Sequence, residues 1–179
     1  MGSFEVTYRE FPAAIETDRF FLRELTVDAA SARYLGWLSD SEAKKWIAAA
    51  ESTCGLAELR EYVAQRVGRD DVLFLGIYSK ADNLHIGNIK YEPVDQNEGR
   101  AELGVLIGDP DFRGKHVFAE VLHASAAWLK LHYGIRQIHL GVELENTPAL
   151  NAYRNSGFVA EPSLQPSHSP GILRMVLYV

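Results

Sequence analysis

Apolar and polar positions follow two different periods along the chain, and the period predicts where helices and strands lie. Helical spacing of apolar residues occurs over residues 28–38, 55–67, 115–132 and 147–156. Continuous or alternating apolar runs predict strands over residues 18–26, 71–79, 85–93, 100–107, 137–143, 158–159 and 172–179. A further short helix is expected over residues 42–50. This order predicts a mixed α/β (α+β) fold in one domain over residues 1–179, with about 1–14 as an N-terminal extension.

The expected helix over residues 115–132 has a clear apolar face. This face consists of Val117, Phe118, Val121, Leu122, Ser125, Trp128 and Leu129. Gly134 is expected to end the helix, because glycine readily adopts the left-handed conformation of a C-cap. At the other end of the chain, Asp28 is expected to cap the helix that ends near Leu38. The strand over residues 71–79 is apolar almost throughout, which predicts that both its faces are covered.

The connection between the strand over 100–107 and the long helix has the chemistry of a phosphate site. The apolar run ends at Gly108, and a basic turn of Arg113, Gly114 and Lys115 precedes the helix. The first backbone N–H groups of a helix have no intrahelical partner, and the helix dipole favours an anion there. The turn therefore indicates a ligand that contains phosphate.

Two widespread phosphate motifs do not match this turn. A P-loop has four residues between its glycines and a Ser or Thr after its lysine. Here residues 109–113 separate Gly108 from Gly114, and His116 follows Lys115. The glycine pattern of a dinucleotide-binding fold is also missing from the sequence.

Composition narrows the classes of partner. Asp and Glu number 24 against 18 Lys and Arg, so the net charge is −6. Binding to nucleic acid or to an anionic membrane needs clustered positive charge, so neither partner is expected. Cys54 is the only cysteine, which rules out an intrachain disulfide and favours a cytoplasmic protein. No apolar run has the length of a membrane span, and no signal peptide is evident.

Four segments, in this order, resemble the GNAT family of N-acetyltransferases. They read FLRELTVDAASARYLGWLSD, HIGNIKY, RAELGVLIGDPDFRGK and ENTPALNAYRNSGF. The resemblance covers roughly residues 18–179, and it points to the branch of ribosomal-protein and amino-sugar acetyltransferases. It implies one acyltransferase domain with a mixed, mostly antiparallel central sheet between helices. It also implies an acetyl-CoA donor, a primary amine acceptor and no requirement for a metal.

The resemblance implies where acetyl-CoA binds. The outer edge of a strand at Leu106 and Ile107 would pair with the amides of the pantetheine arm, and Asn146 would hydrogen-bond the same arm besides capping a helix. The diphosphate would lie on the turn of Arg113, Gly114, Lys115, His116, Val117 and Phe118.

This chain departs from the family pattern within that turn. The family has small residues where this chain has His116 and Phe118. Phe118 blocks the diphosphate if it faces it, but its helical spacing also allows it to turn into the core. Three outcomes are open: CoA binds in a shifted pose, CoA binds weakly, or the site is lost.

The resemblance also suggests catalytic groups. Glu102 lies within an apolar strand, where a carboxylate is costly unless it faces a cleft, and it would act as a general base directly or through water. The alternative is that Glu102 lies on a solvated face or pairs with Arg100 or Lys90. Tyr153 would protonate the departing sulfur, or else it packs in the core with Phe158. Backbone N–H groups near Leu106 would polarise the thioester carbonyl.

The acceptor pocket would involve Arg33, Tyr34 and Trp37, near Trp46. Aromatic side chains in this stretch could stack on a sugar or nucleobase, although their helical spacing is also that of core residues.

The histidines do not form a metal-ligand pattern. His116 and His123 are about 10 Å apart along a helix, too far to share an ion. The other four, His85, His132, His139 and His168, are expected on surfaces.

The sequence thus predicts a transferase that moves an acetyl group from acetyl-CoA to a primary amine of a small molecule, here taken to be an amino sugar. Two alternatives stay open: acetylation of protein N-termini, and a non-catalytic module of the same fold. The expected oligomeric state is a monomer or a homodimer, and the acceptor and acyl length are not specified by the sequence.

Overall fold

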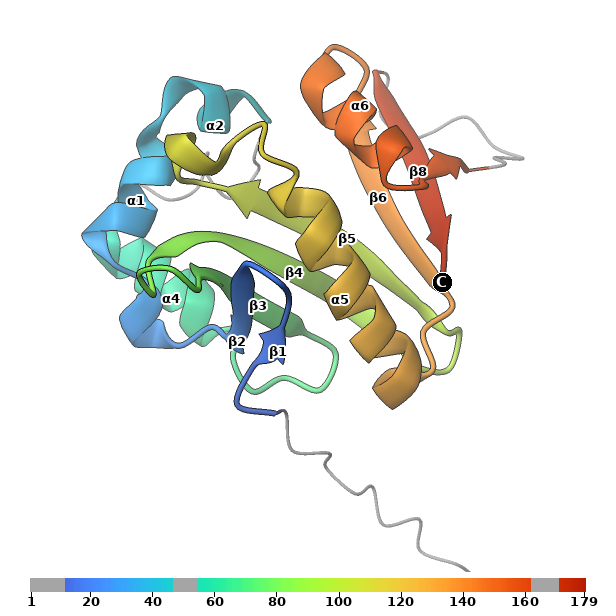
Figure 1. Cartoon of the computed structure of the whole chain (residues 1–179), viewed down its shortest axis with the longest axis horizontal. Coiled ribbons are helices and arrows are strands. Elements are labelled where there is room, and N and C mark those ends of the chain that lie inside the picture. The colour runs from blue at the N-terminus through green and yellow to red at the C-terminus, as the bar shows by residue number, and fades with distance from the viewer. Residues whose placement is uncertain (1–11, 47–54, 162–170) are drawn as a thin grey trace, which may run out of the picture.

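The protein is built around a mostly antiparallel sheet whose strands run in the order β1-β2-β3-β4-β5-β6-β8-β7 (Figure 1). The computed structural model describes residues 12–46, 55–161 and 171–179. The strands are β1 (Ile15–Glu16), β2 (Phe20–Glu24), β3 (Leu73–Ser79), β4 (His85–Asp95), β5 (Arg100–Ile107), β6 (Gln137–Glu143), β7 (Val159–Ala160) and β8 (Ile172–Tyr178). The helices are α1 (Ala32–Ser39), α2 (Ser41–Trp46), α4 (Leu56–Ala64), α5 (Val117–Tyr133) and α6 (Thr147–Asn155).

The mixed α/β architecture and the predicted order of elements are confirmed, with two local differences. The two-residue strand β1 was not predicted, because so short a strand leaves no period to read. The cap of α1 is Ser31 instead of Asp28: the Ser31 hydroxyl accepts a hydrogen bond from the Tyr34 N–H at 3.3 Å. Asp28 lies in a separate 3-10 turn, Val27–Ala29, which interrupts the expected helix. Cys54, His168 and most of the expected N-terminal extension lie outside the described residues.

The helices form layers on the two faces of the sheet (Figure 1). Helix α5 packs on one face, where its buried residues join the main core, as its pattern predicts. Within that core the Tyr91 hydroxyl and the Ser125 hydroxyl share a hydrogen bond of 2.8 Å. Helices α1 and α4 pack on the other face, over Phe74 and Leu106. Strand β3 is therefore covered on both sides, as expected.

Strands β5 and β6 form the one parallel pair of the described sheet, and they remain paired for only a short distance. Their ladder joins Arg100–Glu102 of β5 to Gln137–His139 of β6. Beyond Glu102, β5 is paired only with β4, up to Ile107 opposite Gly87. The two strands thus part at the rung where Glu102 faces His139, and Figure 1 shows β5 and β6 diverging toward the start of α5.

Candidate functional site

The connection from β5 to α5 leaves a run of backbone donors without acceptors. Gly114 and His116 both have positive φ, of 70° and 58°. None of the backbone N–H groups from Gly114 to Ala119, all within the described chain, donates a hydrogen bond to another backbone group. Successive N–H groups at a turn with left-handed residues, followed by a helix N-terminus, form an anion-binding concavity. The turn where the sequence predicts a phosphate site therefore offers a run of backbone donors.

Arg113 uses its side chain to support the end of β5. Its Nε donates to the Ile107 carbonyl at 3.1 Å, and its Nη2 donates to the Gly108 carbonyl at 3.0 Å. Its Nη1 lies 3.7 Å from Asp40 Oδ2, at the end of α1. Lys115 has an exposed side chain, so it is the basic group of this turn that a bound anion can recruit.

The first turn of α5 is also held from the opposite side. Glu120 accepts hydrogen bonds from the Thr17 hydroxyl at 2.6 Å and from Arg19 Nε at 2.7 Å. Burial acts to raise the pKa of Glu120, but the hydrogen bonds from Thr17 and Arg19 outweigh it and hold this pKa below its usual value. Arg19 Nη2 also donates to the Lys115 carbonyl at 3.1 Å. The donor turn is therefore a preorganised segment.

Phe118 takes the inward one of its two expected orientations. Its ring packs against the core and lies edge-on to the Tyr153 ring, with centroids 5.2 Å apart. The Tyr153 ring also contacts the Phe158 ring, with centroids 5.8 Å apart. This is the core packing that the sequence offers as one of two roles for Tyr153. Burial raises the pKa of Tyr153 to about 12, so its hydroxyl keeps its proton at neutral pH. These aromatic rings join α5 to α6.

Asn146 caps α6: its side-chain oxygen accepts from the Ala149 N–H at 3.2 Å. Leu106 and Ile107 lie on the stretch of β5 that has no partner strand on the β6 side. Leu106 leans toward the cluster of α1 and α4, and Ile107 leans toward the main core. The predicted CoA-contacting residues are thus gathered at one end of the sheet.

The predicted acceptor residues lie at the end of β5, but they point into contacts of their own. Arg33 forms an ion pair with the buried Asp109, and its Nε donates to the His85 carbonyl at 3.1 Å. Tyr34 and Trp37 are both buried. The ring of Trp37 lies directly against Gly108, where any side chain would collide with it. This arrangement attaches α1 to the turn that leads to α5.

The expectation that His85 lies on the surface is wrong. Its ring stacks on Tyr78 with centroids 4.8 Å apart and meets Trp37 edge-on at 5.0 Å. Its Nε2 lies 2.9 Å from Asn88 Oδ1. Burial lowers the pKa of His85. The start of β4 reads as an exposed strand end in the sequence, but α1 covers it in the fold.

The partner of Glu102 is Arg174, and not Arg100 or Lys90 as the sequence suggests. Arg174 donates to both carboxylate oxygens of Glu102, with Nη1–Oε1 at 2.5 Å and Nη2–Oε2 at 2.7 Å. This pair crosses β6 at Gly141, where a Cβ would lie in van der Waals contact with Arg174 Nη1, at 3.5 Å. The absence of a side chain at Gly141 was the one signal in the sequence, and it has meaning only once β8 is known to lie beside β6.

His139 is 9% exposed, so the expected surface position is wrong for this residue too. Its Nδ1 lies 3.2 Å from Glu161 Oε1, and its Nε2 lies 3.1 Å from Gln137 Oε1. Glu161 Oε2 also lies 3.5 Å from Arg174 Nε. Glu102, His139, Glu161 and Arg174 form what we call the splay cluster, at the rung where β5 and β6 part.

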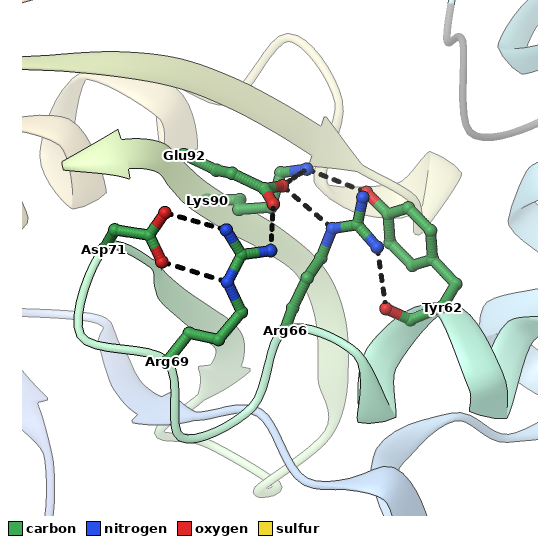
Figure 2. Close-up of polar contacts among 6 residues, drawn as sticks. All are labelled: Tyr62, Arg66, Arg69, Asp71, Lys90 and Glu92. Atoms are coloured by element: carbon green, nitrogen blue, oxygen red, sulfur yellow. Dashed lines mark hydrogen bonds and ion pairs between the residues drawn. The ribbon is translucent and has the colours of Figure 1, made fainter.

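A second polar cluster lies on the same face of the sheet, under α4 (Figure 2). Glu92 accepts from Lys90 Nζ at 2.7 Å, from Arg66 Nε at 2.8 Å and from Arg69 Nη1 at 3.2 Å. Burial acts to raise the pKa of Glu92, but Lys90 and Arg66 outweigh it and hold this pKa below its usual value. The residues in Figure 2 are called the α4 cluster and comprise Tyr62, Arg66, Arg69, Asp71, Lys90 and Glu92.

Comparison with known protein families identifies the fold and its chemistry. The sequence pattern of the acetyltransferase (GNAT) domain matches residues 16–159. The chain belongs to the GNAT acetyltransferase family. It is accordingly an acyl-CoA-dependent N-acetyltransferase.

Solved structures share this fold at low sequence identity. A ribosomal L7/L12 alpha-N-protein acetyltransferase in complex with coenzyme A has a TM-score of 0.81 at 15% identity, covering 93% of this chain and 98% of that chain. The microcin C7 self-immunity acetyltransferase, in complex with acetyl-CoA and AMP, has a TM-score of 0.79 at 16% identity, covering 94% and 98%. A GNAT-family acetyltransferase from Bacillus anthracis has a TM-score of 0.75 at 18% identity, covering 92% and 98%.

These neighbours show the fold and leave the acceptor of this GNAT protein open, since their own acceptors differ. No curated protein sequence matches the chain. Among the residues that the structure describes, no group of three or more His, Cys, Asp or Glu side chains is arranged to hold a metal ion. Across the same described ranges, every helix is too short or too polar to span a bilayer.

Proposed function

We propose that this GNAT protein acetylates the primary amine of a small molecule, with an amino sugar as the acceptor class. The observation that carries the acetyl-CoA half of the proposal is the run of unpaired backbone N–H groups from Gly114 to Ala119. A CoA diphosphate is a ligand of matching charge, and the exposed Lys115 adds a cation beside it. Phe118 turns into the core, so its bulk does not argue against this site.

The parted strands support the placement of the rest of acetyl-CoA. From Leu103 to Ile107 β5 has a free edge on the β6 side, and the amides of a pantetheine arm can pair with such an edge. Asn146, at the start of α6, follows the end of β6, the strand on the other side of this opening. In this arrangement a backbone N–H close to Leu106 polarises the thioester carbonyl, and the opening leads from there to the rung of Glu102 and His139.

The chemistry then needs a neutral amine and a proton for the departing sulfur. Tyr153 is suited to supply that proton, because burial raises its pKa to about 12 and keeps the hydroxyl protonated. Its ring is fixed between Phe118 and Phe158. Glu102 remains a candidate base by its position at the parting rung, although Arg174 occupies both its oxygens.

The amino-sugar preference is supported by the aromatic side chains near the end of β5. Trp46, in α2, is partly exposed and carries the Lys45 ammonium 4.4 Å from its ring centroid. Aromatic faces of this kind stack on sugar rings. Arg33, Tyr34 and Trp37 make mainly internal contacts, so their proposed contribution is to shape the pocket from behind.

Calorimetric titration and thermal shift with acetyl-CoA test the donor. We expect saturable heat and a raised melting temperature. No heat and no thermal shift at millimolar acetyl-CoA would remove the proposal. An acceptor screen then compares nucleotide-linked amino sugars with ribosomal-protein N-terminal peptides, and acetylation of the peptides alone would move the function to protein N-terminal acetylation.

A His116→Gly variant sharpens the donor test. His116 has φ 58°, a conformation that costs a residue with a side chain about 1 kcal/mol and costs glycine little. We expect His116→Gly to raise the melting temperature by about 2–4 °C and to tighten acetyl-CoA binding. The matched control is His123→Gly, in the interior of α5, which we expect to lower the melting temperature. Binding of acetyl-CoA by the variant but not by the natural chain would favour the non-catalytic alternative.

A further inference from the structure

We propose that His139, oriented by Glu161, is the general base that takes the proton from the acceptor amine. This inference rests on the proposed function, and it assigns the base to a residue that the sequence alone placed on a surface. It follows from the position of His139, from the engagement of Glu102 and from the carboxylate partner of the imidazole.

His139 lies at the closed end of the opening between β5 and β6. His139 faces Glu102 on the last rung before β5 and β6 part. Its neighbours Ile138 and Leu140 are buried in the core beneath α5, so the His139 side chain lies on the opposite face of the sheet. On the α5 side the rings of Phe118 and Tyr153 fill the contact between α5 and α6. An amine therefore reaches the thioester from the His139 side.

Glu102 shares that rung, but its carboxylate is already engaged. Both its oxygens accept charge-assisted hydrogen bonds from Arg174, at 2.5 and 2.7 Å. A proton delivered to either oxygen would break one bond of this bidentate pair. Hydrogen bonding to Glu102 also raises the pKa of Arg174, which keeps the guanidinium charged. The pair is thus a stable local structure and a poor acceptor for a proton.

The imidazole has the partner that a histidine base needs. Nδ1 lies 3.2 Å from Glu161 Oε1, so a neutral ring with its proton on Nδ1 donates to that carboxylate. The lone pair of Nε2 then faces the side-chain amide of Gln137, 3.1 Å away. Rotating this amide by half a turn places its nitrogen toward Nε2, so that the amide N–H donates a hydrogen bond to the lone pair. Glu161 fixes the tautomer and stabilises the imidazolium that forms, as carboxylates do in catalytic triads. Gln137 is the group that an arriving amine or water displaces.

The charged groups that face His139 come from the three strands beside it. They are Glu102 and Arg100 from β5, Arg174 from β8, and Glu161 from the segment after β7, while Tyr178 of β8 lies opposite Gln137. Arg174 is neutralised between Glu102 and Glu161. A positive charge gained by His139 therefore forms beside a carboxylate, with the nearest cation already paired.

The proton balance of the step is complete. The ammonium form of the acceptor loses one proton to Nε2 of His139, directly or through one water, and the neutral nitrogen attacks the thioester carbon. The nitrogen–carbon bond forms, the carbon–sulfur bond breaks, and the sulfur receives a proton from the Tyr153 hydroxyl. The second proton on nitrogen returns to Tyr153, and His139 releases its proton to solvent. The products are the acetamide and CoA thiol.

The test is the pH profile of acetyl transfer from acetyl-CoA to a nucleotide-linked amino sugar, with the intact protein. For His139→Gln we expect kcat to fall about 100-fold, which is the low end of the contribution of a general base. We expect KM for acetyl-CoA to stay within threefold of wild type. The acid limb of kcat/KM that belongs to the base should disappear. For Glu161→Gln we expect about a tenfold loss of kcat, because the imidazole loses the carboxylate that orients it. The matched control His123→Gln, exposed on α5, should match wild type.

Chemical rescue separates catalysis from structure. Added imidazole should restore part of the activity of His139→Ala, and it should leave Glu102→Gln unchanged. The proposal would be overturned if His139→Gln kept its activity within threefold of wild type and its acid limb intact. It would also be overturned if the acid limb were lost in Glu102→Gln alone. If the His139 variants fail to bind acetyl-CoA, the partly exposed Glu161 decides: a kcat of Glu161→Gln equal to that of wild type refutes the dyad. Failure of wild type to bind acetyl-CoA defeats the proposed function itself.

Discussion

The α4 cluster and the splay cluster lie on the same face of one sheet and are both built from strand carboxylates and arginines, yet they are arranged for opposite purposes. In the α4 cluster the Glu92 carboxylate accepts from Lys90, Arg66 and Arg69 beneath a helix (Figure 2). In the splay cluster one guanidinium, Arg174, lies between the carboxylates Glu102 and Glu161.

The two clusters differ in which charge is in excess and in whether a helix covers them. Cations outnumber carboxylates around Glu92, and the Arg66 guanidinium also lies 3.7 Å from the centroid of the Tyr62 ring. Carboxylates outnumber the permanent cation around Arg174: Glu161 contacts Arg174 through Oε2 and still offers Oε1 to His139. The lesson is that a saturated cluster stabilises the fold, whereas a cluster with one spare carboxylate is suited to stabilise a transient positive charge.

Removing the charge of Glu92 is expected to give the largest effect on stability. Glu92→Gln leaves Lys90 and Arg66 without a carboxylate, and Arg69 with Asp71 alone, at a site where the Glu92 side chain is only 17% exposed. We expect the free energy of unfolding to fall by about 2 kcal/mol, which lowers the melting temperature by about 4–8 °C. Thermal melting measures this, and kcat should stay within threefold. An equal loss of activity would erase the distinction between the clusters.

The corresponding change in the splay cluster should act on activity instead. Arg174→Gln leaves Glu102 and Glu161 without a permanent cation, but each of these side chains is about a third exposed, so water replaces part of the interaction. We expect less than about 1 kcal/mol of lost stability and about a tenfold fall in kcat/KM, since the two carboxylates then repel each other beside His139. Melting curves and steady-state rates on the same samples check both parts. A melting temperature that drops as far as in Glu92→Gln would contradict the contrast.

Acid should weaken the α4 cluster in a defined direction. The pKa of Glu92 is lower in the folded protein than in the unfolded chain, so its contribution to stability is present above the unfolded value, about 4.3, and is lost as pH falls through the folded value. Urea unfolding at pH 7 and at about pH 4 should show this loss in wild type. Glu92→Gln should show a smaller change between the two pH values, and an identical change would assign the acid sensitivity to other groups.

The smallest expected effect comes from a single hydroxyl. The Tyr62 hydroxyl accepts from Lys90 Nζ at 2.8 Å. Tyr62→Phe removes this bond and keeps the ring under Arg66, so we expect a loss of about 1 kcal/mol in the free energy of unfolding. Urea denaturation resolves such a change. A loss as large as that of Glu92→Gln would mean that the hydroxyl, rather than the carboxylate, organises the cluster.

The chain by itself determined the order of its elements and the local conformation of the turn before α5. These features depend on near neighbours: helical periodicity gives the buried face of α5, Gly134 ends that helix with φ 67°, and Asn146 caps α6 through Ala149. The turn from Gly114 to Ala119 needs only a strand end, a glycine and a helix start. Such signals lie within a few residues of one another, so they can be read from the sequence.

Only the tertiary structure decided which groups meet at the parting of β5 and β6. Glu102 and Arg174 are 72 positions apart, and they meet because β8 lies beside β6 and Gly141 has no side chain to separate them. His139 and His85 are isolated polar residues in the sequence, and strand pairing and the packing of α1 place them among partners. Contacts between distant segments depend on strand order and register, which no local pattern specifies.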